Sequence, residues 1–266
     1  MAPDQRTQRP GFGTAGQWAF VILMGLLTAL FVYLGLWQVS RLGEKQAEIA
    51  TAEARINEPA RALPASDQWA SLDPAQWDYY PVEVTGRFDH DQTVVIFGNL
   101  TDANGPFSGI GYWIMAPLQT GDGGVVWVNR GFVPQDIVGQ YEDGGPGASG
   151  DPITLEAIAR RPERSGPFTP EADIAGRREW IRNPERLALF LADADRPVLP
   201  VTLDAIASGP DGLPQGGETE LRFSNRHLEY AGTWFAFALI TPVMLVFWLA
   251  RQRRRDGRVA RGQADD

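Results

Sequence analysis

The 266-residue chain contains no cysteine and only two histidines, His90 and His227. The lack of cysteine excludes disulfide bonds, thiolate nucleophiles and thiolate metal sites. Two histidines are too few for a hydrolytic triad together with a metal site, and no serine stands in a nucleophile-elbow motif. We therefore do not expect an enzyme that works through its own side chains, and any folded domain must be held together by its core alone.

Charged side chains are absent from two long stretches, residues 18–39 and residues 231–250. As a helix, each stretch is long enough to cross the ~30 Å hydrocarbon core of a membrane. The first could instead be a secretory signal, but its apolar run exceeds the roughly 7–15 residues of a signal core. It also continues into GLWQVSR rather than a small-residue cleavage site. Both stretches are therefore interpreted as transmembrane helices, the first as an uncleaved anchor.

Positive charge collects at the carboxyl end, where RQRRRDGRVARGQADD has six arginines against three aspartates. Because Lys and Arg resist translocation, this tail (residues 251–266) and the amino-terminal tail (residues 1–17) are expected in the cytoplasm. Residues 40–230 then form a periplasmic domain. The chain carries a net charge of −9 while both tails are basic, so this domain is acidic, which argues against nucleic-acid binding. The amino terminus lacks the composition of a transit peptide, which favours a bacterial cytoplasmic (inner) membrane over a mitochondrial one.

Segments rich in Val, Ile and aromatic residues, bounded by Gly, Asn and Asp, predict strands in the outer domain. They cover residues 79–88, 93–100, 111–118, 125–133, 153–161 and 197–206, and a helix is expected over 180–193. The first membrane helix should continue outward and stop near Pro59. The predicted fold class is an α+β membrane protein. Two transmembrane helices flank a mostly antiparallel, β-rich periplasmic domain, with a barrel-like closure as one option.

Three residues of the outer domain need an interpretation of their own. His90 stands between two aspartates in RFDHDQT, but neighbouring residues in a turn point apart, so a solvated turn is favoured over a metal site. Arg130, in VVWVNRGFVP, either orders the turn that follows or faces a partner protein, and the first is favoured. Gly131 is expected to adopt a backbone angle closed to other residues.

The first membrane helix leaves the membrane through Gly35, Trp37, Gln38 and Arg41, and Trp37 and Arg41 share a face because they are four residues apart. The second helix runs in the opposite direction. Two polar and aromatic clusters, far apart in the sequence, must therefore lie at the same membrane depth.

The second cluster consists of Asn225, Arg226, His227, Tyr230 and Trp234, and the spacing i, i+3, i+7 places the last three on one face. If the helices pack together, the two clusters offer an imidazole, flat aromatic walls, an apolar floor and guanidinium groups, which a haem requires. The alternative is that these residues only anchor the helices at the headgroups. Spacing alone does not distinguish the haem-site interpretation from the anchor interpretation.

An ordered set of segments resembles the Surfeit locus protein 1 family between residues 34 and 248. The set comprises GLWQVSRLGEK, YYPVEVTGRF, TVVIF, GYWIMAPLQTGDGGVVWVNRGFVP and NRHLEYAGTWF. The family motif G-x-W-Q-x-x-R falls on Gly35, Trp37, Gln38 and Arg41. The block V-N-R-G-W-V-P falls on residues 128–134, with Phe132 where Trp is usual, a change that should matter little if the ring only packs. The closing motif H-x-x-Y-x-x-T/S-W-F falls on His227, Tyr230, Thr233, Trp234 and Phe235.

The resemblance implies a role in assembling haem-copper cytochrome c oxidase, with haem a bound as cargo and His227 as the candidate iron ligand. Together with the cleft argument, it gives a predicted cofactor site of His227, Tyr230, Trp234, Trp37, Gln38 and Arg41. Expected partners are oxidase subunit I and membrane lipid, with haem a synthase as a further candidate. A second hypothesis is a cofactor-free scaffold that stabilises a subunit I intermediate. A third, a membrane-anchored receptor, lacks a cytoplasmic output domain.

Overall fold

The protein was studied as a computed structural model that describes residues 14–219 and 226–262. Contacts between residues divide the chain into two compact units. One unit spans Met1–Glu48 and Phe223–Asp266, and the other spans Ile49–Arg222. We call the first the helix unit and the second the sheet unit, and each is described by itself.

Two long helices form the helix unit. Helix α1 spans Thr14–Ile56 and helix α4 spans His227–Gly262, and both are long and apolar enough to cross a membrane. They contain the two uncharged stretches predicted from the sequence and extend beyond them, because charged, Ala-rich helix formers follow residue 39. Helix α1 ends three residues before Pro59, close to the predicted stop.

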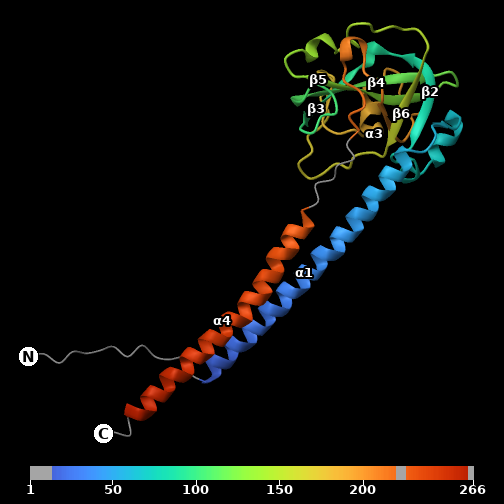
Figure 1. The fold of residues 1–266 in the computed structure, drawn as a ribbon. Helices are drawn as coiled ribbons and strands as arrows, with labels where there is room; N and C mark the ends of the chain where they lie inside the picture. Colours follow the sequence, from blue (N-terminus) through green and yellow to red (C-terminus); the bar gives the residue numbers. More distant parts are fainter. Residues whose placement is uncertain (1–13, 220–225, 263–266) are drawn as a thin grey trace, which may run out of the picture. The chain divides into compact units, whose positions relative to one another are not determined.

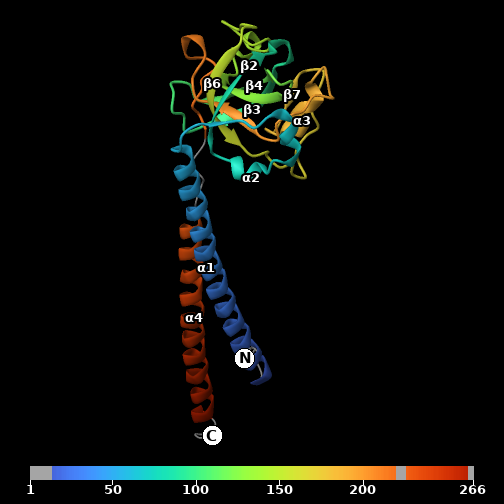
Figure 2. The ribbon, with the colours of Figure 1, turned by 90° about the vertical axis from the view of Figure 1, so that its right-hand side faces the viewer.

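The two helices lie side by side in both ribbon views (Figures 1 and 2). The ring centroids of Phe20 and Trp248 are 4.6 Å apart, and those of Phe31 and Trp234 are 5.9 Å apart. Because later residues of α1 meet earlier residues of α4, the pair is antiparallel. We refer to α1 and α4 within this unit as the helix pair.

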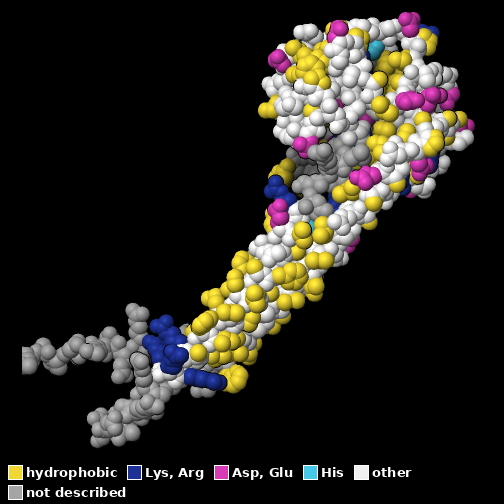
Figure 3. All heavy atoms as spheres, in the orientation of Figure 1, with side chains coloured by type: hydrophobic (Ala, Val, Ile, Leu, Met, Phe, Trp, Pro, Cys, Tyr) yellow, Lys and Arg dark blue, Asp and Glu magenta, His cyan; other side chains and the backbone are white. Residues whose placement is uncertain are grey.

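Figure 3 shows hydrophobic side chains along the visible surface of the helix pair and Lys and Arg side chains near the carboxyl end of α4. Four arginines, Arg251 and Arg253–Arg255, are exposed there. An apolar helix surface that ends in exposed arginines fits a membrane-associated protein, since the arginines remain where water is available.

The sheet unit holds one sheet of eight strands. The predicted strand segments are confirmed, with boundaries shifted by a few residues. The longer strands are β2 (Pro81–Phe88), β3 (Val94–Leu100), β4 (Gly109–Thr120), β5 (Val125–Pro134) and β6 (Ile153–Arg160). The shorter strands are β1 (Arg61–Ala62), β7 (Arg178–Glu179) and β8 (Thr202–Ala205).

Short helical turns connect the strands. They are η1 (Ser66–Ser71), α2 (Pro74–Trp77), η2 (His90–Gln92), η3 (Val138–Gln140), α3 (Pro184–Leu187), η4 (Ala188–Phe190) and η5 (Pro210–Gly212). The helix expected over 180–193 is thus limited to α3 and η4. It begins at Pro184 after the Asn183 cap, whose side chain accepts from the Glu185 N–H, and it stops where Leu191 becomes extended.

The strand order is β1-β2-β6-β8-β5-β4-β3-β7, and β2 also pairs with β4. Strands β2, β6, β8, β5 and β4 therefore form a closed circuit of neighbours, which we call the strand ring. Gly86 is paired with both Ile153 of β6 and Thr120 of β4, so β2 changes partner at this residue. A side chain there would collide with the backbone of Gln119, and glycine is typical of such bends.

The sheet is mixed rather than simply antiparallel. The long pairings of β2 with β6, β3 with β4 and β4 with β5 are antiparallel, as expected. The short strands β1, β7 and β8 add parallel pairings with β2, β3 and β5. Strands β7 and β8 follow long loops and β1 follows α1 almost directly, and alternation of side chains does not reveal the direction in which such a short strand joins the sheet.

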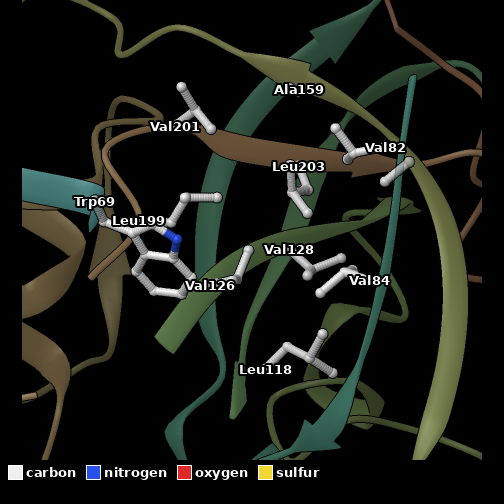
Figure 4. Close-up of a cluster of buried hydrophobic side chains, with 11 residues drawn as sticks. Trp69, Val82, Val84, Leu118, Val126, Val128, Ala159, Leu199, Val201 and Leu203 are labelled. Atoms are coloured by element: carbon white, nitrogen blue, oxygen red, sulfur yellow. The ribbon is translucent and has the colours of Figure 1, made fainter. Parts of the chain in front are cut away.

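The main core fills the inside of the strand ring (Figure 4). Val84, Val128 and Leu203 come from three different strands and point into the same space, and Trp69 of η1 lies beside them. Because side chains alternate along a strand, each strand of the ring supplies every second residue to this core. A fully buried Val or Leu contributes roughly 1.5–3 kcal/mol relative to exposure, so the ring needs no covalent staple.

Candidate functional site

The contact face of α1 is built from residues spaced by three or four. Gly35 and Gln38 are buried, and Phe31, one turn before Gly35, stacks on Trp234 of α4 with 22° between the ring planes. Gly35 lets α4 come close, because an added Cβ would lie 2.6 Å from the Phe235 ring. Small residues permit such approach between membrane helices.

His227, the first residue of α4, contacts α1 through a hydrogen bond to Gln38. The distance between His227 Nδ1 and Gln38 Oε1 is 2.7 Å, and the Gln38 side chain is only 9% exposed. An amide oxygen only accepts hydrogen bonds, so the imidazole donates from Nδ1. Residues 189 positions apart in the sequence thus meet at one end of the helix pair, as the depth argument predicts.

This hydrogen bond fixes the chemistry that the imidazole can perform. In the neutral tautomer that carries its proton on Nδ1, Nε2 has the lone pair and is the nitrogen that could bind a metal. Histidines that ligate metals usually donate their other N–H to an oxygen, which sets both the tautomer and the ring orientation. The pair of His227 and Gln38 matches that arrangement.

Trp37 and Arg41 lie on the flank of α1. Neighbouring helical residues are rotated by about 100°, so Trp37 is turned away from the direction in which Gln38 meets His227. Its ring is 44% exposed, and the Arg41 guanidinium carbon lies 5.7 Å from the ring centroid. Arg41 also pairs with Glu44 at 2.8 Å. The structure therefore brings Trp37 and Arg41 together, but on the side of the contact rather than opposite the imidazole.

On α4 the predicted face has one further member. His227, Ala231 and Trp234 form the stripe that turns toward α1, and Ala231 is almost fully buried. Tyr230 is 54% exposed and lies at the edge of this stripe. The spacing i, i+3, i+7 describes a face about as well as i, i+4, i+7, and only packing against α1 distinguishes them. Asn225, the first residue of the predicted cluster, lies outside the described residues.

Phe31 is a site residue that the sequence prediction missed. It contacts Trp234 and also Phe237, whose ring centroid is 5.6 Å away. The signal was present, because Phe31, Gly35 and Gln38 have the spacing i, i+4, i+7 of a helix contact face. The same spacing also occurs on other sides of this apolar helix, and only packing against α4 selects the side that makes contact.

The residues present fit one axial ligand for a haem better than they fit an enclosed haem pocket. The His227–Gln38 pair presents an imidazole, and Trp37 and Tyr230 offer exposed aromatic surface beside it. Below this level, Phe31 stacks on Trp234 and Gly35 packs on Phe235. A planar ligand would therefore lie at the end or flank of the helix pair rather than between the helices.

The Gly35 contact yields a testable prediction. In Gly35→Leu the new side chain must displace the Phe235 ring, and overpacking of this kind costs about 1–3 kcal/mol. We expect weaker helix pairing, measured as a lower yield of disulfide between cysteines introduced at Phe20 and Trp248. Gly25→Leu is the control, because a Cβ there has nothing within 4 Å. Phe235→Ala should restore pairing, and a Gly35→Leu yield equal to that of Gly25→Leu would contradict the contact.

The VNRGFVP block of β5 has several structural tasks in the sheet unit. Asn129 donates to the Asp204 carboxylate at 3.0 Å and accepts from the Gly131 N–H at 3.1 Å. Arg130 donates to the Gly144 carbonyl at 2.5 Å and so contacts a loop further along the chain, not the predicted turn at Gly131, where β5 continues to Pro134. Phe132 is fully buried against Trp113 with ring centroids 5.6 Å apart, as expected for a ring that only packs.

His90 does not lie in a simple solvated turn. It begins η2, stacks on Phe88 with ring centroids 5.4 Å apart, and lies 3.2 Å through Nε2 from the Ser149 carbonyl. Burial of the ring and the nearby Arg130 cation lower the pKa of His90 below its usual value. Within the described residues no three or more His, Asp or Glu side chains are grouped to hold a metal ion.

Together these features define a protein with two antiparallel helices, each long and apolar enough to cross a membrane, and a mixed-sheet unit inserted between them in the chain. A family model described as the SURF1 family matches residues 25–239. The chain therefore belongs to the SURF1 family, and the resemblance seen in the sequence is confirmed.

Relatives from several animals and a choanoflagellate agree. A SURF1-like protein of Monosiga brevicollis is 34% identical over 233 residues, covering 84% of this chain and 85% of the relative. Surfeit locus protein 1 of Homo sapiens is 31% identical over 243 residues, covering 86% of this chain and 75% of the relative. Surfeit locus protein 1 of Rattus norvegicus is 30% identical, covering 84% and 72%. The similarity thus includes both helices and the sheet unit.

Proposed function

We propose that this chain is an assembly factor for haem-copper cytochrome c oxidase that holds haem a at the end of the helix pair and assists its insertion into subunit I. Membership of the SURF1 family supports the assembly role. The observation that carries the haem role is the hydrogen bond between His227 Nδ1 and Gln38 Oε1, which leaves Nε2 as the available nitrogen.

Each candidate residue has a distinct part in this proposal. His227 is the axial ligand, and Gln38 is a positioning residue that holds its tautomer. Trp37 and Tyr230 supply exposed aromatic surface for the macrocycle, and Trp234, which stacks on Phe31, supports the site from below by holding the helices together. Arg41 would exchange its exposed partner Glu44 for a propionate, at little cost because surface ion pairs are weak. Iron with one protein ligand keeps its second axial position open, which suits a carrier that must release its cargo.

The proposed cellular setting follows from the same features. We infer a bacterial cytoplasmic membrane, with both termini in the cytoplasm and the sheet unit in the periplasm. The exposed arginines at the end of α4 support this orientation, because positive charge is retained on the cytoplasmic side. Haem a synthase is the proposed donor of the cargo, subunit I the acceptor, and membrane lipid the surrounding medium.

The haem role is tested by purifying the full chain in detergent from cells that make haem a. We expect the wild-type protein to carry haem a with the spectrum of a histidine-ligated iron, and His227→Ala to lose most of it. Gln38→Leu should keep the ligand but weaken haem affinity by about 10–100-fold, the usual effect of removing a hydrogen bond to a ligating histidine. Absorbance and haem content measure both effects.

The matched control is His90→Ala, which removes the other histidine of the chain and leaves the helix pair unchanged. It should retain the wild-type haem content and spectrum. Equal haem content in His227→Ala, His90→Ala and wild-type protein would remove His227 from the proposal. Thermal unfolding of each variant checks that a loss of haem is not a loss of folding.

A cofactor-free scaffold is the second candidate, and the packing of the helix pair favours it. Phe31 and Trp234 already stack, and Gly35 already receives Phe235, so the pair is well packed without a ligand. In this case the hydrogen bond of His227 to Gln38 only holds the two helices together. Normal capture of subunit I and normal haem insertion by His227→Ala would support the scaffold and contradict the haem role.

A further inference from the structure

The strand ring has an open end with a cavity of about 640 Å³. Strand β8 ends at Ala205. The Ile206 N–H still donates to the Glu156 carbonyl of β6, and beyond this hydrogen bond the two segments separate. The cavity lies where they part, and its wall includes Ile153 and Leu155 of β6. We call this space the ring mouth. Its size is within the roughly 300–1,000 Å³ of small-molecule sites.

A cation occupies the position where the core would continue. Val126 and Val128 face the inside of the strand ring, and by alternation along β5 the next residue on that side is Arg130, which lines the ring mouth. The Arg130 side chain lies over Phe88, with its guanidinium carbon 5.5 Å from the ring centroid. Burial lowers the pKa of Arg130, which nevertheless stays protonated because its ordinary value is far above neutrality.

Arg130 has hydrogen-bonding capacity to spare. Its Nη1 donates to the Gly144 carbonyl, and among the described residues no carboxylate lies within ion-pair distance of it. A guanidinium has five N–H donors in a planar fork that matches a carboxylate. Arg130 is half-buried, and a charge partly removed from water without a countercharge is costly, so an anion that enters the ring mouth would gain more from pairing than at an open surface.

The rest of the lining limits the charge and shape of that anion. Ile153, Ile206, Pro210 and Pro214 make most of the surface apolar, which requires an apolar body. The single cation Arg130 balances one negative charge. Burial of the His90 imidazole lowers its pKa, so His90 adds no second positive charge at neutral pH. The carboxylates of Asp151 and Glu156 at the exposed rim would repel a dianion such as a phosphate monoester.

We propose that the ring mouth binds an amphipathic monocarboxylate, with the carboxylate on Arg130 and the apolar body between Ile153, Ile206 and the two prolines. The class includes fatty acids, which a membrane supplies. This site belongs to the sheet unit alone, and it does not depend on haem binding by the helix pair.

The proposal is tested with the full chain in phosphatidylcholine nanodiscs and a C12 fatty acid that carries a diazirine at its ω end. Irradiation and peptide mass spectrometry locate the adducts. We expect labelling of residues 147–156 and 205–210, with competition by unlabelled dodecanoate. The same diazirine probe with a hydroxyl in place of the carboxyl should label these residues at least about tenfold less, because the hydroxyl has neither the countercharge nor the two acceptor oxygens that pair with a guanidinium.

Two variants assign the effect to Arg130. Arg130→Gln should lower labelling by the acid to the level of the alcohol probe, and Arg130→Lys should restore part of it. Because Arg130 also contacts the loop at Gly144, its replacement could disturb that loop. Ile206→Asp keeps Arg130 and places a competing carboxylate in the ring mouth. This variant should block labelling as well. Arg178→Gln, in the smaller aromatic cavity beside β7, is the control and should label normally.

Several results would overturn the proposal. These are equal labelling of the ring mouth by the acid and the alcohol, adducts confined to the two long helices, or full labelling in Ile206→Asp. Hydrogen exchange of the β5 amides shows whether each variant remains folded, and if Arg130→Gln unfolds, Ile206→Asp decides the question.

Discussion

Gly131→Ala should lower the free energy of unfolding of the sheet unit by about 2–4 kcal/mol, because two costs combine at this residue. The φ angle of Gly131 is +131°, a region almost closed to residues with a side chain. An added Cβ would also lie 2.3 Å from the Gln215 carbonyl oxygen, which is backbone and cannot rotate away. The Phe132 and Gln215 backbones exchange hydrogen bonds of 2.9 and 2.8 Å, so the collision would separate β5 from this loop.

Gly109→Ala separates the two costs. Gly109 also has a positive φ, +94°, but a Cβ there would meet nothing within 4 Å. We expect a loss of only about 1 kcal/mol for this variant. Urea denaturation of the intact chain, followed by hydrogen exchange of the β4 and β5 amides, measures both. If Gly131→Ala is no less stable than Gly109→Ala, the close approach to Gln215 is wrong.

A loss of similar size is expected for Asp204→Ala. Asp204 is buried and accepts hydrogen bonds from Asn129 at 3.0 Å and Thr219 at 3.1 Å. It also lies 3.8 Å from Arg160 and 3.6 Å from Arg182, both partly buried. Without the carboxylate these cations lose a countercharge that solvent replaces only in part. We expect a cost of about 2–4 kcal/mol, somewhat below that of breaking a fully buried pair.

The control for Asp204→Ala is Glu58→Ala, which breaks the pair of Glu58 with Arg61 in the same unit. Both side chains of that pair are more than 40% exposed, so we expect a loss of less than about 1 kcal/mol. Asp204→Asn tests the role of charge, because it keeps the shape of the side chain and part of its hydrogen bonding. Equal stability of Asp204→Ala and Glu58→Ala would show that the polar cluster around Asp204 does not stabilise the sheet unit.

The two predictions concern neighbouring parts of one motif. Asn129 holds Asp204, and Gly131 lets β5 approach Gln215, so the VNRG segment joins β5 both to β8 and to the loop that follows β8. Between the pairs Met115–Asn129 and Trp113–Phe132, β5 has one residue more than β4, which is a β-bulge. The sequence indicated an unusual backbone at Gly131, but the partner that requires glycine there came from the fold.

The helix pair shows most clearly where sequence reasoning succeeds and where it stops. Two uncharged stretches that cross a membrane in opposite directions place the end of the first and the start of the second at the same membrane depth. The contact of His227 with Gln38 could therefore be anticipated. The rotation of each helix about its own axis could not be anticipated, because it depends on which side chains interlock. Gly35 against Phe235 and Phe31 against Trp234 set that rotation, and they leave Trp37 and Tyr230 on the flanks.

By itself, the sequence determined the two long helices, most of the strands and the residues that resemble the family, since these depend on local composition and on alternation along the chain. Only the tertiary structure decided that β2 pairs with both β6 and β4, that short parallel strands complete the sheet, and that Arg130 lines a cavity. These features depend on which distant segments pack together. The free energy that stabilises them arises from contacts between segments that are far apart in the sequence.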